Sequence, residues 1–140
     1  MIGVIIVAHF GLAERFLEAA EQIAGKKSDT IAAVTINYNK EVDEINRDIM
    51  KAIKKVDNNE GVLILTDMFG GTPCNMSLPF LKEDKVEVLT GLNLPMLIEV
   101  LEIGSQGKSL REFAQEIQCL GQKNICLASE ILNKKPKDER

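Results

Sequence analysis

Gly61-Val-Leu-Ile-Leu-Thr66 is an apolar run of strand length, and Asp67-Met-Phe-Gly-Gly-Thr-Pro73 follows it directly. A continuous apolar run of this length is typical of a strand that is buried on both faces of a parallel sheet. The glycines predict a loop after the strand, and Pro73 suits the first turn of a helix that has Thr72 as its cap. The stretch therefore predicts a buried strand that leads through a short loop into a helix.

The same alternation of strand and helix continues on both sides of this stretch. The other predicted strands cover residues 2–8, 31–36 and 86–90, with a short fifth strand at 124–128. Apolar residues at spacings of three and four predict helices over 12–24 and 42–56. A cap followed by a proline predicts helices over 72–81 and 95–103, the second with Asn93 as its cap, and the capping box Ser109-x-x-Glu112 predicts a helix over 109–120. This order predicts an α/β fold: one domain, a parallel sheet with right-handed crossovers, and helices on both faces. We assign residues 1–132 to the domain and 133–140 to a charged, disordered tail.

Composition narrows the class of protein. The 140 residues are 45% hydrophobic and 27% charged, and the net charge of −4 argues against a nucleic-acid partner. The apolar run at 2–8 is far shorter than the roughly 20 residues of a membrane span, and no basic stretch precedes it as in a signal peptide. Three cysteines (Cys74, Cys119 and Cys126) form no C-x-x-C pair. We therefore expect a cytoplasmic protein without a metal.

His9 and Asp67 are the residues most suited to chemistry. His9, the only histidine, follows the first strand, and Asp67 follows the strand at 61–66. In parallel α/β sheets ligands bind beyond the carboxyl ends of the strands, so both side chains are expected at the binding edge if these strands are neighbours. A carboxylate that accepts from one ring nitrogen leaves the other free to attack. Either residue could instead have a purely structural role.

Gly70, Gly71 and Thr72 form a second candidate site. Glycines allow the backbone to approach a ligand closely, and the N–H groups at a helix start favour an anion such as phosphate. The same residues also suit an ordinary tight turn before a capped helix. The chain has no Gly-Lys-Ser/Thr phosphate loop, no G-x-G-x-x-G after the first strand and no G-x-S-x-G nucleophile. These absences favour a phosphoryl carrier that uses neither a nucleotide nor another cofactor.

Three stretches resemble the enzyme IIA components of the mannose family of the bacterial sugar phosphotransferase system. They are Ile5-Ile-Val-Ala-His9, Leu63-Ile-Leu-Thr-Asp-Met-Phe-Gly-Gly-Thr-Pro-Cys-Asn75 and Thr90-Gly-Leu-Asn-Leu-Pro-Met-Leu97. The resemblance implies a phosphotransferase with a phosphohistidine intermediate: His9 accepts phosphate from the phosphocarrier protein HPr and donates it to an enzyme IIB component for sugar uptake. It further implies that Asp67 orients His9 and that Gly70, Gly71 and Thr72 lie near the phosphate.

The resemblance also implies an assembly. It predicts a homodimer with four parallel strands and a C-terminal strand, here 124–128, exchanged between subunits. It implies no direct insertion into a membrane and allows association with a membrane permease complex. Two residues depart from the family pattern: Phe10 stands where glycine usually follows the histidine, and Cys74 stands where an aromatic residue is common. Phe10, Met68 and Phe69 are the candidate residues for partner docking.

Other functions remain open at this point. The chain could be a regulatory phosphoprotein of an incomplete phosphotransferase system, since the chemistry of His9 would be the same. It could also be the phosphocarrier subunit of a dihydroxyacetone kinase, although that group departs from the motif at 67–75. A ligand-binding module without phosphoryl chemistry predicts that His9 is inert. The identity of the sugar is not encoded in any of these residues.

Overall fold

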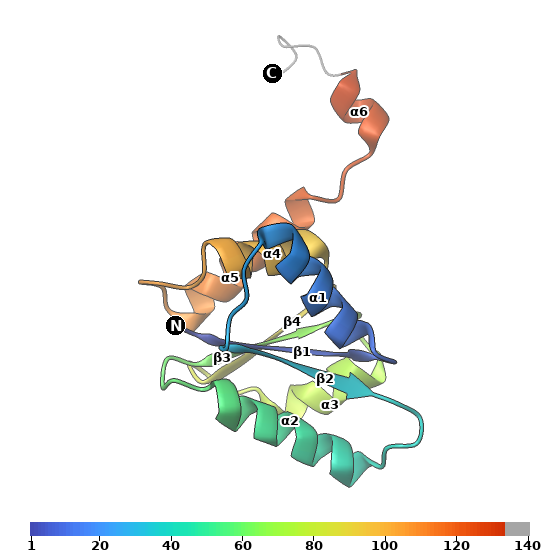
Figure 1. Ribbon diagram of the computed structural model, residues 1–140, viewed down its shortest axis with the longest axis vertical. Coiled ribbons are helices and arrows are strands. Elements are labelled where there is room, and N and C mark those ends of the chain that lie inside the picture. The colour runs from blue at the N-terminus through green and yellow to red at the C-terminus, as the bar shows by residue number, and fades with distance from the viewer. Residues whose placement is uncertain (134–140) are drawn as a thin grey trace.

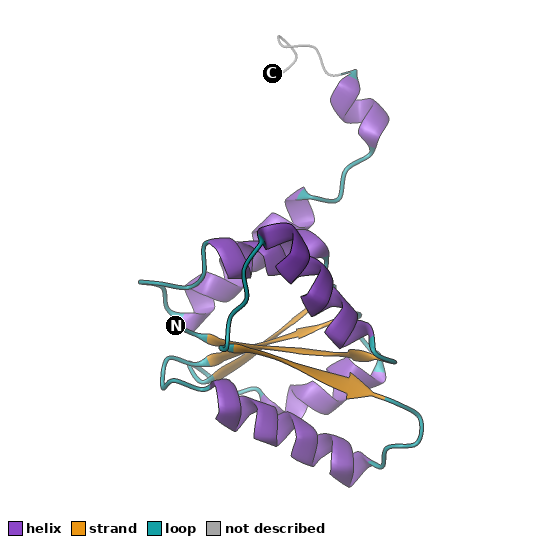
Figure 2. Ribbon diagram, in the orientation of Figure 1, coloured by secondary structure: helices purple, strands orange, loops and turns teal. Residues whose placement is uncertain are grey.

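Four parallel strands in the order β2-β1-β3-β4 form the centre of the computed structural model, which describes residues 1–133. The strands are β1 (Gly3–His9), β2 (Ile31–Ile36), β3 (Val62–Thr66) and β4 (Val86–Thr90). The helices are α1 (Leu12–Ala24), α2 (Val42–Val56), α3 (Thr72–Ser77), the 3₁₀ turn η1 (Leu78–Phe80), α4 (Leu94–Glu102), α5 (Leu110–Lys123) and α6 (Ala128–Leu132). The predicted α/β fold with a parallel sheet and helices on both faces is confirmed (Figure 2).

The sheet divides the core into two layers. Alternate residues of β1 point to opposite faces, as the period of two in a strand requires. Val4 and Ile6 belong to the cluster under α1, α4 and α5, whereas Ile5 and Val7 belong to the cluster over α2 (Figure 1). Because β1 is buried on both faces and flanked by β2 and β3, it is the central element to which the other layers are attached.

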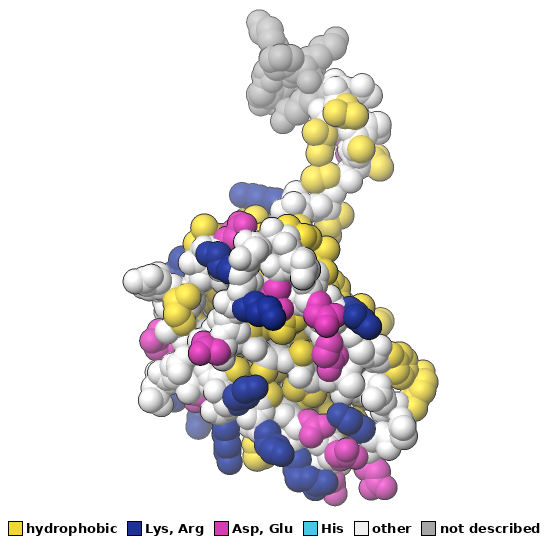
Figure 3. Space-filling view, viewed as in Figure 1, with side chains coloured by type: hydrophobic (Ala, Val, Ile, Leu, Met, Phe, Trp, Pro, Cys, Tyr) yellow, Lys and Arg dark blue, Asp and Glu magenta, His cyan; other side chains and the backbone are white. Residues whose placement is uncertain are grey.

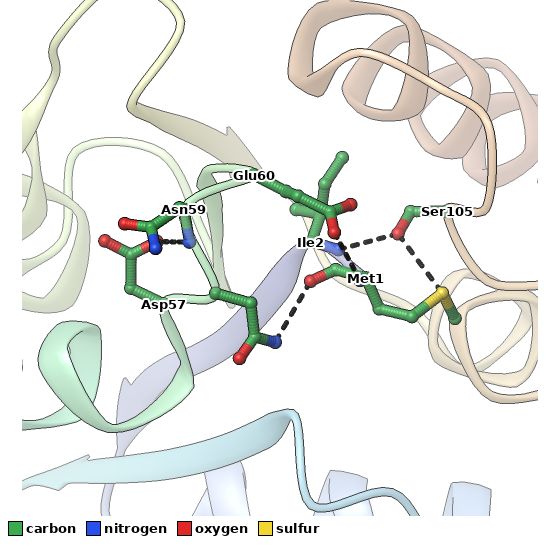
Figure 4. A network of polar contacts seen from close by, with 7 residues as sticks. Met1, Ile2, Asp57, Asn59, Glu60 and Ser105 are labelled. Atoms are coloured by element: carbon green, nitrogen blue, oxygen red, sulfur yellow. Dashed lines mark hydrogen bonds and ion pairs between the residues drawn. The ribbon is translucent and has the colours of Figure 1, made fainter.

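The start of β1 is fastened by polar contacts from two distant segments (Figure 4). The backbone N–H of Ile2 donates to Ser105 Oγ at 2.8 Å, on the connection between α4 and α5. The amine of Met1 lies 3.0 Å from Glu60 Oε2, just before β3. Gly3 then passes so close to the end of α2 that a Cβ there would overlap Val56 O. These contacts fix one end of β1, and His9 lies at the other.

Two predicted helix caps are present. The side chain of Asn93 accepts from the backbone N–H of Met96 at 3.3 Å, at the start of α4. Ser109 and Glu112 form a capping box at the start of α5, in which each side chain accepts from the other residue's backbone N–H. The hydrogen bonds from the backbone and side chain of Ser109 lower the pKa of Glu112.

The predicted helix at 72–81 needs correction. Gly71, not Thr72, occupies the N-cap position, and Thr72 is the first helical residue of α3. The α-helix ends at Ser77, and η1 continues the chain through Leu78–Phe80. Pro79 has no backbone N–H to donate to a carbonyl one turn earlier, so the α-helical hydrogen-bonding pattern is interrupted there.

Within the described residues 1–133, the predicted fifth strand at 124–128 is not formed, and its exchange between subunits stays a prediction. Residues 124–127 belong to no helix or strand, and Ala128 begins α6. The segment projects away from the domain, and none of the described strands pairs with it (Figure 1). Of the predicted tail at 133–140, only Asn133 lies within the described residues.

The surface of the projecting segment is rich in apolar side chains (Figure 3). Ile125, Leu127, Ile131 and Leu132 are 79%, 65%, 56% and 82% exposed. Exposed hydrophobic residues concentrated in this way usually mark an interaction surface. Among residues 1–133, no helix combines the length and apolar character needed to cross a membrane.

Candidate functional site

His9 and Asp67 meet at the carboxyl edge of the sheet. His9 is the last residue of β1, and Asp67 follows the last residue of the neighbouring strand β3. The parallel pairing of these two strands brings their ends together, so that His9 Nδ1 lies 2.7 Å from Asp67 Oδ2. The expectation that the two side chains share one edge is therefore fulfilled by the strand order.

The Asp67 carboxylate is held by the backbone as well as by the ring. Its Oδ2 accepts the backbone N–H of His9 at 3.0 Å, and its Oδ1 accepts that of Met68 at 3.0 Å. The Asp67 side chain is only 10% exposed and that of His9 28%. An ionised carboxylate can only accept hydrogen bonds, so a neutral His9 ring carries its proton on Nδ1 and has its lone pair on Nε2.

Gly71 allows the loop after β3 to lie against the imidazole. A Cβ at this position would come within 2.9 Å of His9 Cε1 and 3.4 Å of Nε2. The neighbouring Gly70 has a φ of +85°, a left-handed conformation that glycine adopts without steric cost. Thr72 is exposed at the start of α3. Of the two predicted phosphate-binding glycines, Gly71 is thus the one where a Cβ would meet the His9 ring.

The turn between β1 and α1 is held by residues that the sequence analysis did not identify. The backbone N–H of Phe10 donates to Ile36 O at 3.0 Å, and that of Gly11 donates to Thr35 Oγ1 at 2.6 Å. Both contacts come from the end of β2, the other neighbour of β1. The position of Thr35 near the end of a predicted strand was the only signal in the sequence that could have suggested this role.

Phe10 adopts a left-handed conformation, with a φ of 47°. For an L-residue with a side chain this conformation costs roughly 1–2 kcal/mol, whereas glycine adopts it freely. The geometry gives a physical reason for the glycine that the family resemblance leads us to expect at this position. Cys74, the other departure, is completely buried in α3 and therefore contributes nothing to the exposed surface of the site.

Apolar side chains are exposed on the segments that follow His9 and Asp67 in the chain. Phe10, Met68 and Phe69 are 53%, 54% and 75% exposed, so none of these three candidate docking residues is buried in the core. They come from the two loops that carry His9 and Asp67. Within residues 1–133 no three metal-ligating side chains gather into a cluster. The site therefore combines an imidazole whose Nε2 is free of the Asp67 contact with exposed apolar side chains from nearby in the chain.

Comparison with known proteins assigns this chain to a family. A model of the EIIA-man family, described as "PTS system fructose IIA component", matches residues 3–118. The chain belongs to this family. A fructose-specific EIIA component of Bacillus subtilis is 30% identical over 135 residues, which cover 96% of this chain and 91% of the relative. A sorbose-specific EIIA component of Lacticaseibacillus casei is 34% identical over 98 residues, 69% of this chain and 70% of the relative.

Solved structures agree with the assignment to the EIIA-man family. An EIIA component from Streptococcus agalactiae superposes with a TM-score of 0.81 at 26% identity, over 92% of this chain and 98% of that one. A PTS IIA protein associated with the fucose utilization operon of Streptococcus pneumoniae gives 0.80 at 26% identity, over 94% and 96%. The predicted resemblance to mannose-family IIA components is confirmed, and membership of the family implies phosphotransfer in sugar uptake.

The His9–Asp67 contact predicts the tautomer of the ring. In wild-type protein, two-bond ¹H–¹⁵N NMR spectra should show the neutral His9 ring with its proton on Nδ1. In Asp67→Asn the neutral amide holds that proton less strongly, so the population should shift toward the Nε2–H form. Because the chain has one histidine, the spectrum contains a single imidazole.

Asp48→Asn is a suitable control, since Asp48, on α2, pairs with Lys40 and not with the His9 ring. A wild-type ring protonated mainly on Nε2, or an Asp67→Asn spectrum identical to that of wild type, would contradict the orienting role of Asp67.

Proposed function

We propose that His9 carries a phosphoryl group, accepting it from phospho-HPr and donating it to an enzyme IIB component for sugar uptake. The observation that carries this proposal is the 2.7 Å contact between His9 Nδ1 and Asp67 Oδ2, which directs the lone pair to Nε2. Support also comes from the family, because the relatives that match the chain are phosphotransferase-system components. Asp67 acts as the orienting group and His9 as the nucleophile.

The transfer needs no cofactor and no metal in this scheme. The Nε2 lone pair forms a bond to phosphorus while the bond between phosphorus and the donor's own atom breaks, and the donor keeps that electron pair. Positive charge grows on the imidazole as the bond forms, and the Asp67 carboxylate stabilises it. In the second half of the cycle the acceptor attacks phosphorus, and Nε2 recovers its electron pair.

The loop after β3 is the proposed phosphate site. With no side chain on Gly71, the backbone lies against the imidazole, where a Cβ would come 3.4 Å from Nε2. Gly70 and the N–H groups that begin at Thr72 complete the proposed contacts with the phosphoryl oxygens. Asn75 Nδ2 donates to Gly70 O at 3.3 Å and so helps to hold the loop in place.

Phosphate transfer from HPr tests the carrier function directly. HPr charged by enzyme I and phosphoenolpyruvate should place an acid-labile label on wild-type protein and none on His9→Ala, because His9 is the only histidine. Lys40→Ala, which leaves the histidine intact, serves as a labelled control. No label on wild-type protein, with an HPr shown to be active on another acceptor, would contradict the proposal and favour a ligand-binding module.

The same histidine chemistry would serve a regulatory phosphoprotein of an incomplete phosphotransferase system. The two roles differ in the acceptor. A labelled protein that passes its phosphate to an enzyme IIB component encoded beside it would support transport. The dihydroxyacetone kinase alternative differs in the same way, since its acceptor would be another subunit of that kinase.

We also propose Phe10, Met68 and Phe69 as the docking patch for these partner proteins. They are exposed close to His9 and Asp67 in the chain, and the ring centroid of Phe10 lies 5.8 Å from that of His9, which supports their contact with a protein that reaches Nε2. Exposed aromatic residues contribute strongly to many interfaces, so Phe69→Ala should slow phosphate exchange with the partners roughly tenfold. The measurement is the rate of label transfer at limiting partner concentration. A Phe69→Ala protein with wild-type rates would contradict this assignment.

A homodimer held by the C-terminal segment is the proposed assembly. Ile125, Leu127, Ile131 and Leu132 are exposed on a segment that projects from the domain. Their burial against a second copy would gain roughly 25 cal/mol for each Å² of apolar surface removed from water. Such a protein would remain outside the membrane and could still assemble with a permease complex through its partners.

Sedimentation velocity tests this assembly. Wild-type protein should sediment with twice the mass of one chain. Leu127→Asp should shift the sedimenting species toward the monomer, because a charged side chain is costly to bury in the proposed interface. Ile103→Asp is the matched control, at a residue 59% exposed just after α4. A monomeric wild-type protein, or a Leu127→Asp variant as dimeric as wild type, would exclude this segment as the interface.

A further inference from the structure

Phe10 has an aromatic partner that could not be expected from the order of residues along the chain. Tyr38, in the connection between β2 and α2, lies with its ring centroid 4.6 Å from that of Phe10, at an interplanar angle of 59°. The Phe10 ring in turn lies 5.8 Å from the His9 ring. The rings of His9, Phe10 and Tyr38 therefore follow one another in space, each beside the next.

This pair contributes little to the hydrophobic core. Tyr38 is 92% exposed and Phe10 53%, so neither ring is covered by the rest of the domain. Phe10 also occupies a left-handed backbone conformation, which is unfavourable for a bulky side chain. Costly backbone conformations cluster at functional sites, where binding or catalysis depends on the geometry they produce. Here the strained residue places an exposed ring beside the nucleophile.

A charged hollow adjoins the pair. Phe10, Gly11 and Thr35 line it together with Glu14, Arg15 and Glu18 of α1. Arg15 Nη1 lies 2.9 Å from Glu18 Oε1, whereas Glu14 has no ion-pair partner among residues 1–133. With two carboxylates and one guanidinium, this side of the site favours a basic side chain on any surface that covers Phe10.

We propose that Phe10 and Tyr38 select the phosphoryl donor, a protein that carries an apolar side chain flanked by a basic one beside its phosphorylated residue. The inference rests on the proposed function and adds Tyr38 and the donor's surface chemistry to it. The donor meets unphosphorylated His9, which offers no phosphoryl charge for recognition. A donor also brings its own dianion toward Glu14 and Glu18, so a basic side chain on the donor offsets the repulsion.

The test compares a protein donor with a small one. Phosphoramidate can phosphorylate an imidazole but has no apolar surface to place against the pair. In Tyr38→Ala and Phe10→Gly, the KM for phospho-HPr should rise about tenfold with kcat nearly unchanged, as expected for loss of an interface aromatic. The rate of labelling by phosphoramidate should stay within twofold of wild type. Phe10→Gly suits the left-handed backbone, and Tyr38→Ala removes an almost fully exposed side chain.

Two further variants sharpen the result. Ile23→Ala removes an apolar side chain that is 60% exposed near the other end of α1, and it should leave both donors unaffected. Glu14→Gln should raise the KM for phospho-HPr about threefold and weaken its dependence on salt, because the charge that attracts the donor is lost. If the variants slowed labelling by phosphoramidate as much as labelling by phospho-HPr, the pair would act by positioning His9, and donor selection would be overturned.

The remaining outcomes separate this inference from the carrier function. An unchanged KM for phospho-HPr in both Tyr38→Ala and Phe10→Gly would overturn the inference while leaving the carrier function intact. Wild-type protein labelled by phosphoramidate but not by phospho-HPr would overturn the inferred donor and retain a reactive His9. Wild-type protein labelled by neither would overturn the carrier function and the inference together.

Discussion

The parallel pairing of β1 with β3 is the constraint on which the site depends. Val7 of β1 is in register with Thr66 of β3. His9 lies two residues after Val7 and Asp67 lies directly after Thr66, so both emerge at the same edge of the sheet. Both strands are buried on both faces, and a shift of register by one residue would turn their apolar side chains to the wrong layer. The packing of the core therefore fixes the distance between the His9 ring and the Asp67 carboxylate.

Asp67 links this framework to the chemistry. Its carboxylate accepts two backbone N–H groups as well as the ring, so its position is set by the ends of both strands and not by the side chain alone. A hydrogen bond to a charged group contributes roughly 1.5–3 kcal/mol, enough to hold the imidazole in one orientation. Gly71 completes the arrangement by keeping the opposite side of the ring free of a side chain. The site is built mainly from backbone geometry.

The two apolar features outside the core have different physical origins. The rings of Phe10 and Tyr38 are exposed because they stand at the edge where strands end and loops begin. The C-terminal residues are exposed because the chain leaves the domain after α5, and no strand within residues 1–133 pairs with this segment. The first feature lies beside the His9 ring, whereas the second lies on the segment that projects from the domain.

Local pattern in the sequence determined the four strands, the helices between them, the caps at Asn93 and Ser109 and the candidate pair His9 and Asp67, because each depends on periodicity, residue chemistry or position after a strand. The resemblance supplied the family. Only the tertiary structure decided that β1 and β3 are neighbours, that Thr35 holds the turn after His9 and that Tyr38 contacts Phe10, since these contacts join residues distant in sequence. The predicted strand at 124–128 is not formed within residues 1–133 for the same reason: a strand exists only where another strand accepts its hydrogen bonds, and none of the described strands pairs with this segment.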